Sequence, residues 1–462
     1  MSYWKSICLG CALFAAMGIS ASAQTFTTLA DFPTYDIRHS ALILGRDGNL
    51  YGVGETGGTT DNGRVFKITP SGTLTTVYSF CAVGNCTDGL VPNSPLALGL
   101  DGDFYGTTQA GGENSKGTVF KVSPSGVEQV LHSFNGTDGS IPAAGLVLGS
   151  DGYFYGSTYN GGTSTECTFG CGTIFKISPG GTLTTLYNFE FPDGNYPSAP
   201  LVEGDDGNFY GTTVYGGIAT ALCSFGCGTV FKITPGGEWT SVHAFAFSEG
   251  AYLNSALTQD RSGSFYGSAP YGGYDVFGAC SEGCGTLFRI TPEGELTVLQ
   301  APHSAAYSTT ALVVASDRKI YGMSSGQLYS LAPSDQVTTV YTLPAGLTAS
   351  DAVLQGTDGK FYGTYNYNNG ASSAIYSLDT GLRRYVGFVI AIGKIGKAAQ
   401  ILGQGLTGTT SVTFNGVAAA KFSVVSDTYV TAVVPAGATT GAVVVATPAG
   451  NLSSNVSFRI SK

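Results

Sequence analysis

Charged residues are scarce in this sequence. Asp, Glu, Lys and Arg together make up 11% of the 462 residues, and acidic residues outnumber basic ones by 31 to 21. Nucleic-acid binding requires a basic patch or stripe. An acidic chain without a basic cluster therefore argues against a nucleic-acid partner.

Long hydrophobic runs are also missing, except at the N-terminus. Residues 1–23 contain Lys5, an apolar run from Ile7 to Ile19, and the small residues Ala21-Ser22-Ala23. These are the three regions of a secretory signal peptide. No later stretch approaches the ~20 apolar residues that a membrane helix needs. We therefore expect an exported chain, secreted, periplasmic or at the cell surface, with no transmembrane anchor after residue 23.

Recognisable catalytic motifs are absent as well. The sequence has no Gly-x-Ser-x-Gly elbow, no His-Glu-x-x-His and no phosphate-binding Gly-Lys-Ser/Thr loop. We accordingly assign no catalytic residue, no metal ligand and no cofactor. Glycoside cleavage by paired carboxylates stays open, because the separation of such a pair is a three-dimensional quantity.

The cysteines fall into close pairs. Cys8 and Cys11 belong to the expected signal peptide, and the remaining eight pair as Cys81/Cys86, Cys167/Cys171, Cys223/Cys227 and Cys280/Cys284. In an exported chain such local pairs predict disulfides. The alternative is metal binding, although no pair has zinc-ribbon spacing or a nearby histidine.

Glycine, tyrosine and phenylalanine are abundant, and they recur in a fixed phrase. With 68 glycines, 26 tyrosines and 26 phenylalanines, the composition indicates many short strands joined by tight turns. The phrase appears in seven units: Asp47-Gly-Asn-Leu-Tyr-Gly52, Asp101-Gly-Asp-Phe-Tyr-Gly106, Asp151-Gly-Tyr-Phe-Tyr-Gly156, Asp206-Gly-Asn-Phe-Tyr-Gly211, Ser262-Gly-Ser-Phe-Tyr-Gly267, Asp317-Arg-Lys-Ile-Tyr-Gly322 and Asp358-Gly-Lys-Phe-Tyr-Gly363. Successive repeat tyrosines are 54, 50, 55, 56, 55 and 41 residues apart, which predicts a repeat architecture. The repeat Tyr-Gly itself is interpreted as a core column.

The third unit illustrates the strands expected in each repeat. A short apolar strand at 146–149 precedes Asp151-Gly152, for which we expect a two-residue hairpin turn. Further strands are predicted at 153–159, 172–178 and 182–189 from their alternation and the Gly/Pro turns between them. Four antiparallel strands per unit are typical of a propeller blade.

The two ends of the repeat region complement each other. Thr25–Phe32 resembles a fourth strand without the preceding three, and the seventh unit lacks a fourth strand. We therefore expect an all-β, seven-bladed β-propeller closed by the N-terminal strand, which removes exposed sheet edges.

The units resemble the Gloeo-Verruco (GloVer) tandem repeat of exported bacterial proteins. The resemblance rests on Asp-Gly-x-Phe-Tyr-Gly, on Gly-Gly, and on phrases such as Gly-Thr-Val-Phe-Lys-Ile-Thr-Pro. It covers about residues 25–382 and is weaker in unit six. It implies an exported bacterial protein with a propeller, which we place at residues 24–382. It does not imply an enzymatic activity.

A different alternation begins after Leu382. Short strands are predicted within 403–417 and 430–445, as in a small β-sandwich. The segment is similar to the IPT/TIG immunoglobulin-like domain, and we place this domain at residues 383–462. Such modules on secreted bacterial chains usually serve as spacers or adhesive units, which is an analogy of fold alone.

Binding residues are expected on the loops at one end of the propeller. Tyrosines open the loops between the second and third strands of units three to five, and an acid followed by glycine recurs between units. The ligand-binding candidates are Tyr159, Tyr215, Tyr271, Asp88, Asp138, Asp193 and Glu249. Packing over the glycines and ordinary turn chemistry are the respective alternatives.

These features favour a non-enzymatic recognition or cell-envelope protein that binds carbohydrate or a protein partner through this loop rim. One alternative is an extracellular propeller enzyme, a polysaccharide-degrading hydrolase or lyase. The other is a purely structural surface protein.

Overall fold

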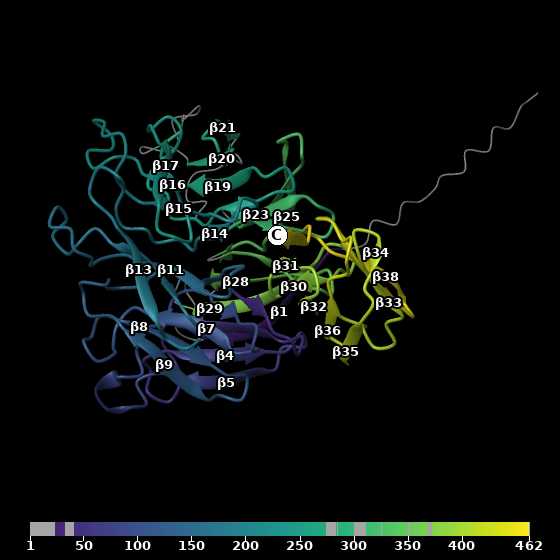
Figure 1. Cartoon of the computed structure of the whole chain (residues 1–462). Coiled ribbons are helices and arrows are strands. Elements are labelled where there is room, and N and C mark those ends of the chain that lie inside the picture. The colour runs from purple at the N-terminus through teal and green to yellow at the C-terminus, as the bar shows by residue number, and fades with distance from the viewer. Residues whose placement is uncertain are drawn as a thin grey trace, which may run out of the picture.

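The structure is a computed structural model, and it describes residues 24–32, 41–273, 283, 285–299, 311–324, 326–349, 352–367 and 372–461. Within these ranges the regular secondary structure is almost entirely β-strand, joined by turns and loops, and the one helical element is the 3-10 turn η1 (Gly84–Cys86). None of the described helical residues forms a segment long and apolar enough to cross a membrane. Figure 1 shows a large body of sheets with a smaller C-terminal unit, in yellow, against one side. The expected signal peptide, residues 1–23, lies outside the described residues.

Each repeat forms one antiparallel sheet whose strands pair in chain order. Unit 1 contains β2 (Ile43–Leu44), β3 (Leu50–Gly54), β4 (Arg64–Ile68) and β5 (Leu74–Ser79). Unit 2 contains β6 (Ala97–Leu98), β7 (Phe104–Thr108), β8 (Thr118–Val122) and β9 (Glu128–Ser133). Unit 3 contains β10 (Val147–Leu148), β11 (Phe154–Thr158), β12 (Thr173–Ile177) and β13 (Leu183–Asn188). Unit 4 contains β14 (Val202–Glu203), β15 (Phe209–Thr213), β16 (Thr229–Ile233) and β17 (Trp239–Ala244).

The remaining units follow the same plan with one departure. Unit 5 contains β18 (Thr258–Gln259), β19 (Phe265–Ala269), β20 (Thr286–Ile290) and β21 (Leu296–Leu299). Unit 6 contains β22 (Val313–Val314), β23 (Ile320–Ser324), β24 (Gln327–Leu331) and β25 (Val337–Thr342). Unit 7 contains β26 (Thr348–Ala349), β27 (Leu354–Gln355), β28 (Phe361–Tyr367) and β29 (Ser372–Asp379). This sheet has five strands: β26 and β27 both pair with β28. Its outer strand comes from the other end of the chain, because β1 (Thr25–Phe32) pairs antiparallel with β29.

The repeat tyrosines form the core, as the sequence predicted. Each is at most 4% exposed, and the tyrosine ring of one unit packs on the phenylalanine of the next. Ring centroids lie 4.0 Å apart for Tyr51 and Phe104, and 3.8 Å apart for Tyr155 and Phe209. The units are therefore joined through aromatic side chains.

The hairpin turn differs from the expected two-residue form. In unit 3 the Gly152 N–H donates to the Gly149 carbonyl at 2.9 Å, and the Gly149 N–H donates to the Tyr153 carbonyl at 2.8 Å. Three loop residues, 150–152, therefore lie between the paired Gly149 and Tyr153. Of Asp151 and Gly152, only the glycine has positive φ, at 85°. The reason is that Asp151 has a different role: its carboxylate accepts bonds from the Tyr153 N–H at 3.1 Å and the Tyr155 hydroxyl at 2.7 Å.

The C-terminal unit is a separate β structure with its own core. One sheet contains β30 (Gly387–Phe388), β32 (Ala398–Leu402), β36 (Tyr429–Val433) and β35 (Phe422–Ser426). A second contains β34 (Val417–Ala418), β33 (Ser411–Phe414), β37 (Val443–Thr447) and β38 (Gly450–Ser453). The short strands β31 (Ile392–Lys394) and β39 (Arg459–Ser461) pair in parallel. Fully buried side chains such as Ile401, Val430 and Phe414 fill the space within this unit.

The glycine after the repeat tyrosine supports a specific prediction. In unit 3, Gly156 lies opposite Phe175 on β12, and a Cβ at Gly156 would lie 2.7 Å from the Phe175 ring and 2.8 Å from Leu146. Overpacking of this kind costs about 1–3 kcal/mol. We expect Gly156→Ala to lower the urea midpoint of unfolding, measured by far-UV circular dichroism.

Gly180→Ala is the matched control within the same unit. A Cβ there has no neighbour nearer than 3.8 Å, so we expect little change in stability. Equal effects of the two substitutions would contradict the close packing of Phe175 over Gly156.

Candidate functional site

The two ends of the sheets carry different connections. The Asp-Gly hairpins lie at one end, and because the strands are antiparallel, the loops after the second strand and the connections between units lie at the other. At this second end, here called the loop face, isolated β-bridges join the connections after units 1 to 4 to the loop of the following unit. The bridges are Leu90↔Ala110, Ser140↔Asn160, Asn195↔Tyr215 and Ala251↔Tyr271.

The three predicted tyrosines are brought together on the loop face by two others. Tyr159 stacks on Tyr196 with ring centroids 4.5 Å apart, and Tyr196 lies 5.9 Å from Tyr215. Tyr252 then lies 5.3 Å from Tyr215 and 5.5 Å from Tyr271. We call these five half-buried side chains the tyrosine row. It runs continuously from unit 3 to unit 5.

The row places phenol groups near one another. Burial, followed by the neighbouring Tyr215 and Tyr196 hydroxyls, raises the pKa of Tyr159. The phenol therefore remains protonated at neutral pH and keeps its capacity to donate a hydrogen bond. The row thus combines aromatic faces with polar edges, which suits ligands that have both apolar and hydroxyl-bearing surfaces.

Tyr196 and Tyr252 were not predicted from the sequence, because their position depends on an unusual backbone. Their φ angles are 55° and 61°, in the left-handed region that bulky residues rarely adopt. The Tyr196 N–H donates to the Cys171 carbonyl at 3.1 Å, and the Tyr252 N–H donates to the Cys227 carbonyl at 2.8 Å. Strained residues persist where surrounding contacts fix them, and here the acceptors belong to cysteine-bearing loops.

Disulfides fix these loops. The structure joins Cys81 to Cys86, Cys167 to Cys171 and Cys223 to Cys227. The fourth predicted pair, Cys280 and Cys284, lies outside the described residues. No cluster of three or more potential metal-binding side chains occurs in the described part of the chain.

The disulfide-bonded loops of units 3 and 4 also present apolar side chains to solvent. Phe169 is 73% exposed and Phe225 is 62% exposed, while the flanking cysteines are buried. Ile218 and Leu222 are exposed on the unit 4 loop as well. The Phe225 ring lies 6.2 Å from Tyr215, so this apolar surface adjoins the tyrosine row. The repeated phrase Cys-x-Phe-Gly-Cys, at 167–171 and 223–227, was the signal in the sequence that could have identified it.

The predicted acids are held within their own connections. Each carboxylate bonds to the residue near the end of the preceding fourth strand: Asp88 with Tyr78, Asp138 with His132, Asp193 with Tyr187 and Glu249 with His243. Three also accept backbone N–H groups, from Ala82, Asn135 and Ala246. Every one of these acids therefore has a local role in shaping its turn.

Three solved structures are similar in fold. A streptogramin B lyase is 15% identical with a TM-score of 0.52, covering 77% of this chain and 97% of its own. Virginiamycin B lyase from Staphylococcus aureus is 13% identical with a TM-score of 0.50, covering 77% and 98%. A fungal alcohol oxidase of the AA5 family, in complex with copper, is 15% identical with a TM-score of 0.54, covering 95% and 99%. At these identities the likeness shows the fold alone, and the neighbours define it as that of β-propeller proteins.

The sequence itself matches a known repeat. The profile of the Gloeobacter/Verrucomicrobia repeat matches residues 15–170, 85–281 and 150–327. The chain belongs to this family. No curated protein matches the chain in sequence.

One acid beside the predicted set has a perturbed environment. Glu128 begins β9 at a position that is apolar in the equivalent strands, where Leu74, Leu183, Trp239 and Leu296 stand. Burial, and then the charge of Asp88, raise the pKa of Glu128 to about 7, while a hydrogen bond with Tyr78 acts in the opposite direction.

The raised pKa predicts a pH-dependent stability. The folded pKa of Glu128 is above its unfolded value of 4.5, so the folded state binds the proton more tightly and loses stability as pH rises from about 4.5 through about 7. We expect Glu128→Gln to stabilise the protein at pH 8 by about 1 kcal/mol, allowing for solvent screening at a half-buried site, and to change little at pH 4. Thermal unfolding at both pH values measures this.

The exposed Glu113 provides the control through Glu113→Gln, which should be neutral at both pH values. If Glu128→Gln changed stability equally at pH 4 and pH 8, the proposed environment of Glu128 would be wrong.

Proposed function

We propose that this protein is an exported, non-enzymatic recognition protein that binds carbohydrate through the loop face of units 3 to 5. The observation that carries the proposal is the tyrosine row together with the adjoining exposed Phe169 and Phe225. Sugar rings stack on aromatic faces, and phenol hydroxyls at the ring edges bond to sugar hydroxyls. A row of five tyrosines offers both kinds of contact across three units.

The preorganised backbone supports a binding role. Disulfides close the loops that carry Phe169 and Phe225, and backbone hydrogen bonds hold Tyr196 and Tyr252 at positive φ. Ligand binding to a surface that is already ordered costs less conformational entropy than binding to a mobile loop. This order, and the solvent exposure of the two phenylalanines, favour recognition over a purely structural role.

The acids support binding more than catalysis. A glycosidase uses two carboxyl groups that flank the scissile bond, and neither can be committed to holding a turn. Asp88, Asp138, Asp193 and Glu249 each bond within their own connection. In our proposal these acids shape the loop face, and the aromatic side chains contact the ligand.

The proposal includes the finer architecture expected from the sequence. The seven sheets are the blades of a seven-bladed propeller, and β1 completes the seventh blade through its pairing with β29. The C-terminal unit is an immunoglobulin-like sandwich of the IPT/TIG kind, supported by its two four-stranded sheets around one core. Residues 1–23 are the signal peptide that directs export, and the disulfides accord with an oxidising compartment.

A glycan-array assay on the mature protein, residues 24–462, tests the binding function. We expect Phe169→Ala/Phe225→Ala, and separately Tyr159→Ala/Tyr215→Ala/Tyr271→Ala, to weaken binding by at least about tenfold. The reason is that each aromatic contact contributes about 0.5–1.5 kcal/mol.

Val127→Ala is the matched control. Val127 is 70% exposed, and it lies in the turn between β8 and β9, at the end opposite the loop face. This variant should bind as the unsubstituted protein does. Failure of the unsubstituted protein to bind any glycan, or equal loss in the control, would contradict the proposed function.

A further inference from the structure

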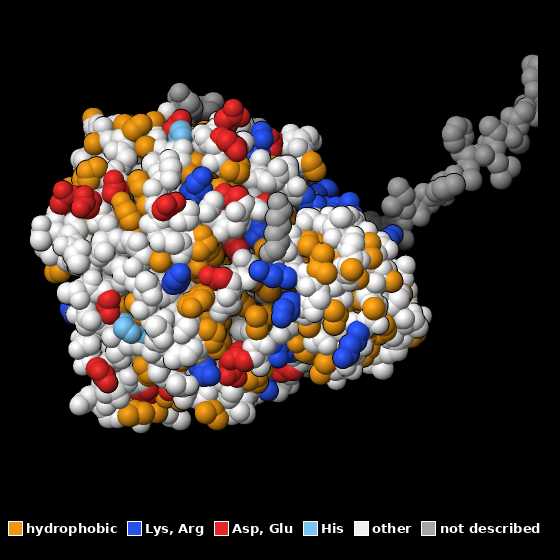
Figure 2. All heavy atoms as spheres, viewed as in Figure 1, with side chains coloured by type: hydrophobic (Ala, Val, Ile, Leu, Met, Phe, Trp, Pro, Cys, Tyr) orange, Lys and Arg blue, Asp and Glu red, His pale blue; other side chains and the backbone are white. Residues whose placement is uncertain are grey.

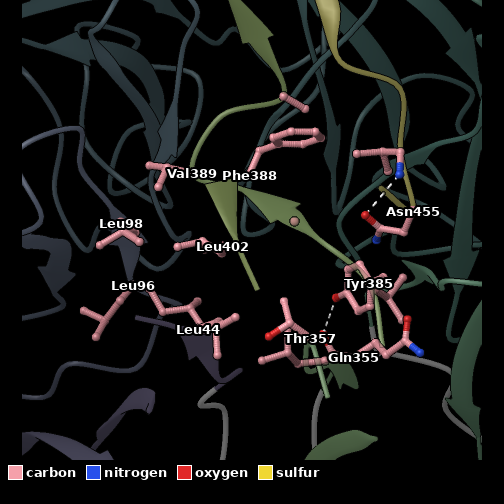
Figure 3. Close-up of a pocket in the computed structure, with 16 residues that line it drawn as sticks. Leu44, Leu96, Leu98, Gln355, Thr357, Tyr385, Phe388, Val389, Leu402 and Asn455 are labelled. Atoms are coloured by element: carbon pink, nitrogen blue, oxygen red, sulfur yellow. Dashed lines mark hydrogen bonds between the residues drawn. The ribbon is translucent and has the colours of Figure 1, made fainter. Parts of the chain in front are cut away.

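A cavity of 340 Å³ lies at the other end of the molecule, where the C-terminal unit meets the repeat units. On one side are residues of the first strands, including Leu44 and Leu98. On the other are Phe388, Leu402 and Val456 of the C-terminal unit. Figure 3 shows Leu44, Leu96 and Leu98 on one side of this space, with Phe388 and Val389 above them. The lining is predominantly apolar, and the volume lies at the low end of the range for small-molecule pockets.

The walls are held in place by arginines that cross the junction. Figure 2 shows basic side chains gathered along the boundary between the two bodies. Arg46 donates to the Leu100 carbonyl at 2.6 Å and to Gln400 Oε1 at 2.7 Å. From the opposite direction, Arg459 pairs with Glu203 at 3.1 Å. These contacts fix the C-terminal unit over the first strands, so the cavity is a defined feature of the fold.

Most polar groups in the cavity wall already have partners. The Tyr385 hydroxyl donates to the Gln355 carbonyl at 2.6 Å, as drawn in Figure 3. The side-chain amide of Gln355 donates to the Gly359 carbonyl at 3.1 Å and accepts the Ser316 N–H at 2.7 Å. Asn455 donates to the Val314 carbonyl at 2.8 Å and accepts the Val456 N–H at 3.0 Å.

Thr357 is the exception. Its side chain is 1% exposed, and its hydroxyl has no hydrogen-bond partner within the described part of the chain. Figure 3 shows Thr357 between Leu44 and Tyr385 at the cavity wall. A buried hydroxyl without a partner destabilises a fold, and buried polar groups in native proteins are nearly always satisfied. A hydrogen-bonding group from outside the chain would satisfy this hydroxyl.

Water suits this site poorly, because a buried water molecule requires two to four polar partners. We propose that the cavity binds a small apolar molecule that carries one hydrogen-bonding group, and that this group bonds to the Thr357 hydroxyl. The leucines, Phe388 and Val456 contact the apolar part of the ligand. The site is independent of the loop face, so its test does not depend on glycan binding.

Benzyl alcohol and ethylbenzene are suitable probes, since they have nearly the same shape and only the alcohol has a hydroxyl. We expect isothermal titration calorimetry on the mature chain to detect binding of both. Thr357→Val should weaken benzyl alcohol binding about fivefold, the worth of one hydrogen bond of about 1 kcal/mol. Binding of ethylbenzene should change by less than about twofold, because valine keeps the shape of threonine.

A second pair of variants tests the location of the site. Leu98→Trp should abolish binding of both probes by filling the cavity, whereas Val127→Trp should not, since Val127 is 70% exposed and outside the lining. Circular dichroism checks that each variant is folded. If Leu98→Trp does not fold, the comparison of the two probes with Thr357→Val still tests the proposal. Absence of binding by the unsubstituted protein, or an equal effect of Thr357→Val on both probes, would overturn the proposal.

Discussion

The hydrogen bond between the repeat tyrosine and the aspartate four residues before it is the interaction on which the repeat units depend. It forms in six units, with distances such as 2.8 Å for Tyr51 and Asp47 and 2.6 Å for Tyr362 and Asp358. Burial first, and then this hydrogen bond, raise the pKa of Tyr51, so the phenol stays protonated and donates. The Asp47 carboxylate positions both the hairpin and the tyrosine ring, because its other oxygen accepts the backbone N–H of Asn49.

The same tyrosine ring then orders the next unit. Because the hydroxyl is fixed at the hairpin, the ring faces the phenylalanine that follows it, with interplanar angles of 21° to 34° in units 1 to 4. The centroids are 3.9 Å apart for Tyr105 and Phe154 and 4.2 Å apart for Tyr210 and Phe265. One short phrase of sequence thus specifies both the turn within a unit and the contact between units. This explains why the phrase recurs while the loops differ in length.

Unit 5 indicates how far this interaction can vary. Ser262 replaces the aspartate, and Asp260 instead accepts the Ser262 and Ser264 N–H groups. The Tyr266 hydroxyl donates to Asp335 of unit 6, at 3.3 Å. The hairpin and the tyrosine therefore each keep an acid, although the two acids come from different units. Each unit thus requires a carboxylate for the hairpin N–H groups and a carboxylate for the tyrosine hydroxyl, but these carboxylates need not come from one position in the sequence.

Alternation and turn residues predicted the strands and the tyrosine column, but not the side-chain contacts that form only in the folded structure. The tyrosine column, β1 and all four strands of unit 3 could be predicted from alternation and turn residues. The three-residue hairpin loop could not, because the Asp151 carboxylate accepts a hydrogen bond from the Tyr155 hydroxyl. Tyr196 and Tyr252 could not be assigned either, since their contacts with Tyr215 depend on bridges between neighbouring units. In each case the missing information was a contact between side chains whose positions only the assembled sheets determine.

The arrangement of the two ends bears on where a ligand can be recognised. At the hairpin end, the carboxylates are used by tyrosines and the first strands are covered by the C-terminal unit, held by Arg46 and Arg459. At the loop face, the connections vary in length without disturbing the tyrosine column, because their bonds are made to neighbouring loops. Phe169 and Phe225 could therefore be placed in solvent there at little cost to the fold. Substitutions in the loops are therefore tolerated at the loop face, whereas substitutions in the hairpins would remove contacts on which every unit depends.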